Sequence, residues 1–225
     1  SDGARDLLAN QGVGAGHRVV VLCENCVAAV VFLFACWKLS AIAVPVNARQ
    51  SESEVARVLA HSDPAAVILS TQISPDARAH AARLNAVPVT GAFGTVHLAV
   101  RAQTVPDSDR RIAVLLYTTG TTGAPKGVML SHENLTFGGG ASAKLRQMGP
   151  DDLIYGVLPI THVFGLASVV TASCYTGATV RMEARFTAAK LFEALQDGVT
   201  LLSAVPQMHA LLMQYTKEQG LTTLG

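Results

Sequence analysis

LLYTTGTTGAPKG, residues 115–127, is the stretch from which the rest of the chain can be placed. The apolar run 112–116 has the β-branched and aliphatic content of a buried strand and leads directly into it. Glycines let backbone N–H groups turn toward a ligand, and threonine hydroxyls and Lys126 add donors and a positive charge. The stretch is therefore predicted to be a loop that binds phosphate oxygens; a threonine-rich surface turn is the alternative.

Two common phosphate-binding motifs do not fit this stretch. In the Walker A motif, G-x-x-x-x-G-K-[ST], Pro125 would stand at the second glycine and Gly127 at the Ser or Thr. The dinucleotide motif, G-x-G-x-x-G, needs a glycine spacing that the stretch lacks. The loop must therefore be of another kind.

The composition indicates a globular protein with few charges. The 225 residues suffice for one large or two small domains, and half of them are hydrophobic. Only 15% are charged, against about 25% in an ordinary domain, which suggests surfaces that more protein covers. A net charge of +1 and scattered basic residues argue against nucleic acid and acidic membranes as partners. The longest apolar run, 26–37, is too short to cross a bilayer.

The cysteines point to a reducing compartment. Four are present without a secretory signal, so we expect free thiols and a cytoplasmic protein. Cys23 and Cys26 have the spacing of a zinc or redox pair, but a second pair that would complete a zinc site is missing. No metal-binding residue is predicted.

Strands and helices alternate along the whole chain, which predicts an α/β fold with mostly parallel sheets flanked by helices on both faces. Ser51 and Glu54 form a capping box at the start of one helix. The glycines at 138–140 lie inside another helix, so something is expected to pack closely against them. The polar segment 101–111 is the clearest linker and divides the chain into segments 1–105 and 106–225.

Two loops follow strand ends and carry residues suited to chemistry. One spans 118–126, and the other spans 159–165 and contains His162. In open α/β sheets, ligands bind beyond the carboxyl ends of the strands. We therefore expect both loops to line one crevice.

The chain resembles the adenylate-forming superfamily, and in particular its acyl-CoA synthetase branch. Residues 115–127 match its AMP-binding signature position for position. GVMLSHENL at 127–135 resembles the acyl-CoA ligase form, and LPITHVFG at 158–165 is similar to the family's LPxxHxxG. Further likeness lies in GHRVVVL (16–22), VPVN (44–47) and VPQM (205–208). Ser40 and Thr161 depart from the pattern, where the family often has glycine and many members have histidine.

The resemblance implies the first half of the large N-terminal domain of an adenylate-forming enzyme, without its C-terminal domain. The implied activity is ATP-dependent activation of a carboxylic acid, such as a fatty or aromatic acid, to an acyl-adenylate and then an acyl-CoA thioester. ATP, Mg²⁺ with its ligand outside these residues, and coenzyme A would take part, in a chain compatible with a homodimer. Residues 1–225 alone are expected to fold but to be inactive. The alternatives are a peptide-synthetase adenylation domain and a non-catalytic nucleotide-binding module.

The resemblance also assigns roles to single residues. Lys126 and His162 would be catalytic. The phosphate cradle would comprise Thr118, Thr119, Gly120, Thr121, Thr122, Gly123 and Lys126. The acid would be bound by His162, Val163, Phe164 and Gly165. The alternatives are a solvated Lys126, a His162 merely hydrogen-bonded within its loop, and core positions for Val163 and Phe164.

Overall fold

The structure, a computed structural model, describes residues 1–102, 107–118 and 126–221. They belong to two compact units, Ser1–Leu135 and Thr136–Gly225. The boundary between the two units follows Leu135 and therefore lies C-terminal to the linker expected at 101–111. The reason is that the strand after the linker pairs within the sheet of the first unit.

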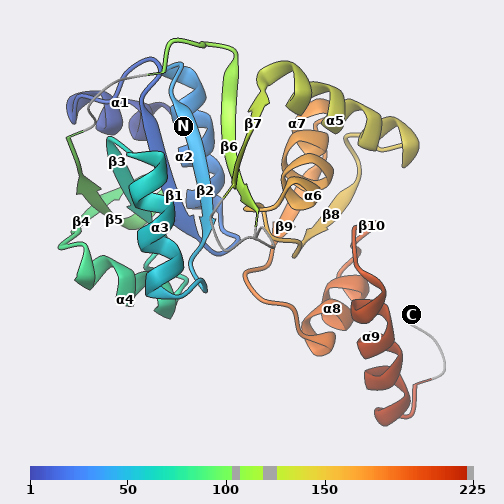
Figure 1. Cartoon of the computed structure of the whole chain (residues 1–225). Helices are drawn as coiled ribbons and strands as arrows, with labels where there is room; N and C mark the ends of the chain where they lie inside the picture. Colours follow the sequence, from blue (N-terminus) through green and yellow to red (C-terminus); the bar gives the residue numbers. More distant parts are fainter. Residues whose placement is uncertain (103–106, 119–125, 222–225) are drawn as a thin grey trace. The chain divides into compact units, whose positions relative to one another are not determined.

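The first unit is built on a seven-stranded sheet with the order β4-β5-β3-β1-β2-β6-β7 (Figure 1). Its strands are β1 (Arg18–Cys23), β2 (Ile42–Asn47), β3 (Ala66–Leu69), β4 (Val87–Gly91), β5 (Gly94–Val100), β6 (Ile112–Thr118) and β7 (Lys126–Ser131). Its helices are α1 (Asp2–Asn10), α2 (Val27–Lys38), α3 (Glu52–Ser62) and α4 (Pro75–Arg83).

Parallel pairing occupies the middle of this sheet, as expected. β1 pairs in parallel with β2 and β3, and β2 pairs in parallel with β6. Both margins are antiparallel, because β4 pairs with β5 and β6 pairs with β7 as neighbours in the sequence. The alternation of elements indicates the parallel centre but not which short connections form hairpins.

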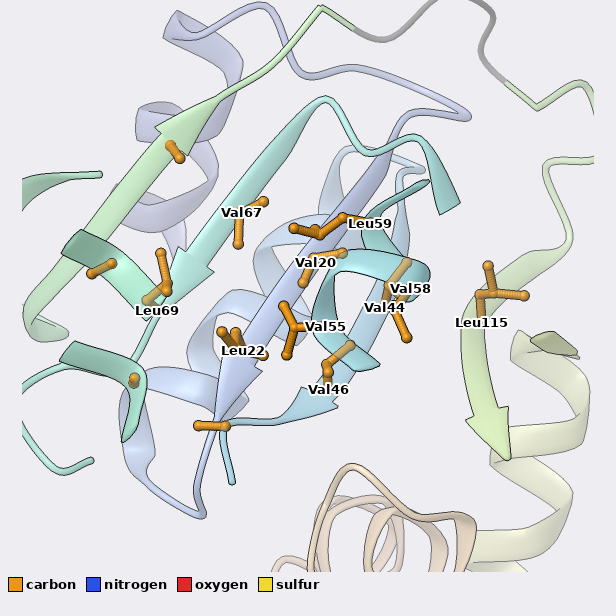
Figure 2. Close-up of a cluster of buried hydrophobic side chains, with 14 of the residues drawn as sticks. Val20, Leu22, Val44, Val46, Val55, Val58, Leu59, Val67, Leu69 and Leu115 are labelled. Atoms are coloured by element: carbon orange, nitrogen blue, oxygen red, sulfur yellow. The ribbon is translucent and has the colours of Figure 1, made fainter. Parts of the chain in front are cut away.

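The core on one face of the sheet is made by alternate strand residues and one side of α3 (Figure 2). Val20 and Val44 contribute from β1 and β2, while Val55, Val58 and Leu59 of α3 recur at the spacing of one helix face. α2 packs on β1 and β2, and its buried residues are not part of this cluster. Helices therefore cover both faces, as the sequence predicts.

The predicted capping box starts α3. The Ser51 Oγ accepts a hydrogen bond from the Glu54 N–H at 3.4 Å, and the Ser51 N–H donates to Glu54 Oε2 at 2.7 Å. Two N–H groups that lack helical partners are satisfied in this way. The hydrogen bonds to Ser51 also lower the pKa of Glu54.

The second unit contains a three-stranded parallel sheet with the order β10-β8-β9. Its strands are β8 (Leu153–Gly156), β9 (Thr179–Met182) and β10 (Leu201–Leu202). Its helical elements are α5 (His132–Leu145, which begins at the end of the first unit), α6 (Val163–Gly165), the π-helical segment η1 (Leu166–Thr171), α7 (Ala172–Thr176), α8 (Ala188–Gln196) and α9 (Pro206–Glu218).

Two elements of the second unit are irregular. β10 has only two residues, and Pro206 begins α9 shortly after it. The helix that begins after His162 contains the π-helical segment η1.

The glycines of α5 allow close helix packing, as predicted. A Cβ atom on Gly139 would lie 2.7 Å from the Oγ1 of Thr171, and one on Gly140 would lie 3.3 Å from the ring of Tyr175. Both neighbours belong to the helix that contains η1 and α7. The glycines therefore offset their low helix propensity by letting this helix approach α5 closely.

Tyr155 of β8 provides a first test of the packing. Its hydroxyl is buried with no hydrogen-bond partner among the described residues, and burial raises its pKa to about 12. We expect Tyr155→Phe to leave the free energy of unfolding unchanged or raise it by about 1 kcal/mol, because it removes an unsatisfied polar group and keeps the ring. Urea denaturation measures this change.

The matched control is Tyr117→Phe. Its hydroxyl lies 2.6 Å from the Nδ1 of His61, so the same change removes a hydrogen bond and should lower the stability by about 1 kcal/mol. Equal losses in both variants would contradict the unsatisfied state of the Tyr155 hydroxyl.

Candidate functional site

The base of the predicted phosphate loop is a pair of strand residues. β6 ends at Thr118, β7 begins at Lys126, and the two are direct antiparallel partners. Cross-strand partners place their side chains on the same face of a sheet, and both residues are exposed. The two described members of the predicted cradle are thus brought together. Its other members, Thr119, Gly120, Thr121, Thr122 and Gly123, lie outside the described residues.

The strand end beside this pair is tied to α3. Tyr117 precedes Thr118, and its side chain belongs to the core on the α3 face. Its hydroxyl lies 2.6 Å from the Nδ1 of His61 at the end of α3, and the two rings meet nearly edge to face. Burial raises the pKa of Tyr117. Successive strand residues point to opposite faces of a sheet, so the side chain of Thr118 points to the face opposite α3.

The glycine that ends the Pro-Lys-Gly sequence has a packing role. Gly127 lies opposite Tyr117, and a Cβ atom built on it would lie only 2.7 Å from Cδ1 of Leu115. A larger residue would require the Leu115 side chain or β7 to shift. Glycine at this position therefore lets Leu115 of β6 pack closely on β7, next to the Thr118–Lys126 pair.

The same edge of the sheet carries an ion pair that the sequence did not reveal. β1, β2 and β6 are parallel, so their carboxyl ends lie at the same end of the sheet, where Thr118 is the last residue of β6. The Nε of Arg49 lies 3.5 Å from Oε1 of the buried Glu24, and the Arg49 N–H donates to Oδ1 of Asn47 at 3.0 Å. The available signal was the presence of polar residues directly after two buried strands.

The second candidate loop belongs to the second unit and follows β8. His162 stands at the N-cap of α6, where its Nδ1 accepts a hydrogen bond from the Phe164 N–H at 3.1 Å. In the neutral imidazole the proton is therefore on Nε2, which becomes a hydrogen-bond donor. His162 is exposed, so this donor is available to an oxygen of a ligand.

The residues after His162 differ in their surroundings. Val163 and Phe164 are 46% and 44% exposed, so neither lies in the core formed by the described residues. Gly165 is buried, and a Cβ atom on it would lie 2.2 Å from the carbonyl oxygen of Pro159. Apolar side chains beside the histidine are thus open to a ligand, while the glycine holds the helix against the preceding loop.

The two loops belong to different units, and their convergence in one crevice stays a prediction. No group of three or more His, Cys, Asp or Glu side chains that could hold a metal ion occurs in the described parts of either unit. Within those same residues, none of the helices has the length and apolar character needed to span a bilayer.

Solved structures of adenylate-forming enzymes resemble the chain. The ATP-bound structure of MatB from Rhodopseudomonas palustris has a TM-score of 0.75 and 26% identity, and the match covers 94% of this chain and 43% of that one. The o-succinylbenzoate CoA synthetase MenE from Bacillus subtilis, in complex with its acyl-adenylate intermediate, has a TM-score of 0.73 and 26% identity, over 94% of this chain and 55% of that one. These likenesses confirm the expected fold class.

Sequence relatives are CoA ligases. The mitochondrial malonate–CoA ligase ACSF3 of Homo sapiens is 30% identical over 210 residues, 88% of this chain and 36% of that protein. The indoleacetate–CoA ligase of Aromatoleum aromaticum is 31% identical, over 86% of this chain and 41% of its own. The chain thus spans less than half the length of these curated relatives. The family of AMP-binding enzymes matches residues 3–224, and the chain belongs to that family.

Proposed function

We propose that the protein containing this chain activates a carboxylic acid with ATP and then transfers the acyl group to coenzyme A. The observation that carries the proposal is the pairing of Thr118 with Lys126 at the base of a loop that has the family's phosphate-binding sequence. The CoA-ligase activities of the relatives support the choice of acceptor.

The proposed first step needs positive charge and hydrogen-bond donors. A carboxylate oxygen of the acid attacks the α-phosphorus of ATP, the bond to the bridging oxygen breaks, and pyrophosphate leaves with its electrons. Charge develops on the departing phosphates, so Lys126 and the Thr118 hydroxyl would lower the barrier by contacting them. In this proposal, the N–H and hydroxyl groups of Thr119, Gly120, Thr121, Thr122 and Gly123 complete the cradle.

The second step replaces AMP by a thiol. The sulfur of coenzyme A attacks the acyl carbon, the bond from that carbon to the phosphate oxygen of AMP breaks, AMP leaves with the electron pair, and the thiol proton is released to solvent. The Nε2–H of His162 would donate to a carboxylate oxygen of the acid, while Val163 and Phe164 would contact its apolar part.

Mg²⁺ would accompany ATP, but the described residues include no cluster that fits it, so no step is assigned to it.

The test is ATP–pyrophosphate exchange in the complete gene product, screened over acids. Malonate, indoleacetate, sulfoacetate and fatty acids form the first panel, because ligases for these acids are among the relatives. We expect exchange with at least one acid and a CoA thioester when coenzyme A is added. Exchange without CoA-thioester formation would favour a carrier-protein acceptor. Nucleotide binding without exchange for any acid would favour a non-catalytic module.

His162→Ala should weaken use of the acid and leave ATP binding nearly intact. Loss of one donor to a charged oxygen should lower kcat/KM for the acid about tenfold or more, because hydrogen bonds to charged groups are worth about 1.5–3 kcal/mol. Calorimetric ATP titration and acid-dependent exchange separate the two effects. His209→Ala is the matched control, since His209 is an exposed histidine on α9. A loss of ATP affinity as large as that of Lys126→Ala would contradict the assignment.

We also propose a reducing compartment, with the cytoplasm as the first choice. The four cysteines of the chain are free, and three of them are buried. Burial raises the pKa of Cys23 and Cys36, so little of the reactive thiolate forms and these residues resist oxidation. The human relative is a mitochondrial protein, which makes the mitochondrial matrix the alternative.

A further inference from the structure

A series of hydrogen bonds runs along the helix that begins at His162. The Phe164 N–H donates to Nδ1 of His162 at 3.1 Å. The carbonyl oxygen of Phe164 accepts from the Ser168 hydroxyl at 2.6 Å. The carbonyl oxygen of Ser168 in turn accepts from Nη2 of Arg146. The imidazole of His162 is thereby connected, bond by bond, to a guanidinium on another segment.

Arg146 joins three segments of the second unit. It follows the last residue of α5 and donates to the Ser142 hydroxyl at 2.9 Å, to the Ser203 hydroxyl after β10 at 2.7 Å, and to Ser168 of η1. Its partners are neutral oxygens, and burial lowers the pKa of its guanidinium. Ser168 and Ser203 are themselves buried. The guanidinium is thus hydrogen-bonded to serines of three segments.

One glycine of α5 allows a close approach to the π-helical segment η1. Gly139 packs against Thr171, which lies in the same π-helical segment as Ser168. π-helical segments depart from the regular hydrogen-bond pattern of a helix and are frequent at functional sites. Here the π-helical segment lies between His162 and α7. The carbonyl oxygen of Ser168 within it accepts a hydrogen bond from the side chain of Arg146, which belongs to another segment.

We propose that Ser168 and Arg146 are positioning residues for His162. By fixing the backbone of Phe164, they keep its N–H directed at Nδ1 and so hold the imidazole in the tautomer with the proton on Nε2. The catalytic meaning of this role rests on the proposed function, in which Nε2–H donates to the acid. The tautomer itself does not depend on that function.

The test compares Ser168→Ala with Ser173→Ala. Ser173 is also a buried serine of the same helix, and its hydroxyl donates to the carbonyl of Val170 at 2.9 Å, away from His162. Long-range ¹H–¹⁵N spectra of the chain labelled on histidine report which ring nitrogen carries the proton, and His162→Gln assigns the signals. We expect the ratio of the two tautomers to fall about fivefold in Ser168→Ala, the equivalent of one typical hydrogen bond, and to stay constant in Ser173→Ala.

A second variant addresses the guanidinium. Arg146→Lys keeps the positive charge but cannot contact three segments at once, so the tautomer ratio should fall at least as far as in Ser168→Ala. If Arg146→Lys does not fold, the serine pair still decides. An unchanged ratio in Ser168→Ala, or an equal fall in Ser173→Ala, would overturn the proposal.

Activity supplies the separate readout. In the complete gene product, Ser168→Ala should lower kcat/KM for the acid about fivefold and leave KM for ATP within about twofold. If no acid supports exchange in the unmodified protein, the proposed function is rejected. The tautomer ratio of His162 would still test the positioning role of Ser168 and Arg146. A changed tautomer ratio with unchanged acid kinetics would reject the link between His162 and the acid.

Discussion

Replacing Lys126 by alanine should lower ATP–pyrophosphate exchange about 100-fold or more, because one charged donor to the leaving group is removed. The fold should persist, since Lys126 is exposed and stands at the first position of β7. Exchange kinetics measure the effect, and urea denaturation of the same sample confirms that the protein is folded.

The control for this variant is Lys217→Ala, which removes an exposed lysine from α9 and should leave exchange unchanged. Lys126→Arg should recover part of the activity, because it keeps the charge but replaces a compact donor by a planar one. Unaltered exchange in a folded Lys126→Ala protein would disprove the phosphate-loop assignment.

Gly165→Ala should lower the free energy of unfolding by more than about 3 kcal/mol or prevent the second unit from folding. The added Cβ atom would lie 2.2 Å from the carbonyl oxygen of Pro159 and 2.6 Å from that of Leu158. Both are backbone atoms, so relief requires the helix that begins after His162 to move away from the loop. Urea denaturation followed by circular dichroism measures the loss.

Gly138→Ala is the matched control for this change. Its Cβ atom would lie 3.6 Å from the Cβ of Ala167, an ordinary van der Waals distance, inside α5. Alanine is favoured over glycine in a helix by about 1 kcal/mol, so this variant should be slightly more stable. Similar losses in both variants would show that the contacts of Gly165 do not decide the cost.

Local signals in the sequence predicted the alternation of strands and helices. The capping box at Ser51 depends on residues close in the sequence, and the glycine run 138–140 is itself a local signal of close packing; the structure has the capping box and close contacts at Gly139 and Gly140. The antiparallel pairing of β5 with β3 and the pairing of the short β10 with β8 join strands that are not consecutive, and periodicity does not encode such pairing. The π-helical segment has the same apolar character as an ordinary helix, so composition could not distinguish it.

The candidate site was predictable in its residues more than in its contacts. The signature identified Thr118 and Lys126, but their direct pairing follows from the register of β6 and β7. The bonds from Tyr117 to His61 and from Arg49 to Glu24 join residues on different elements, and only the folded chain brings them together. For His162, the sequence suggested a role, while the N-cap contact defines which nitrogen can donate.

The pairing of β6 with β7 gives strand register a part in the proposed phosphate contact. Because Thr118 and Lys126 are cross-strand neighbours, the entropy cost of joining the two ends of their connection falls on folding and not on ligand binding. Doubling the length of a connection adds only about 0.6 kcal/mol to that cost. A slip of one residue, in contrast, would turn Lys126 to the opposite face of the sheet. We therefore expect a change of register between the two strands to harm the proposed phosphate contact more than the entropy cost of a longer connection would.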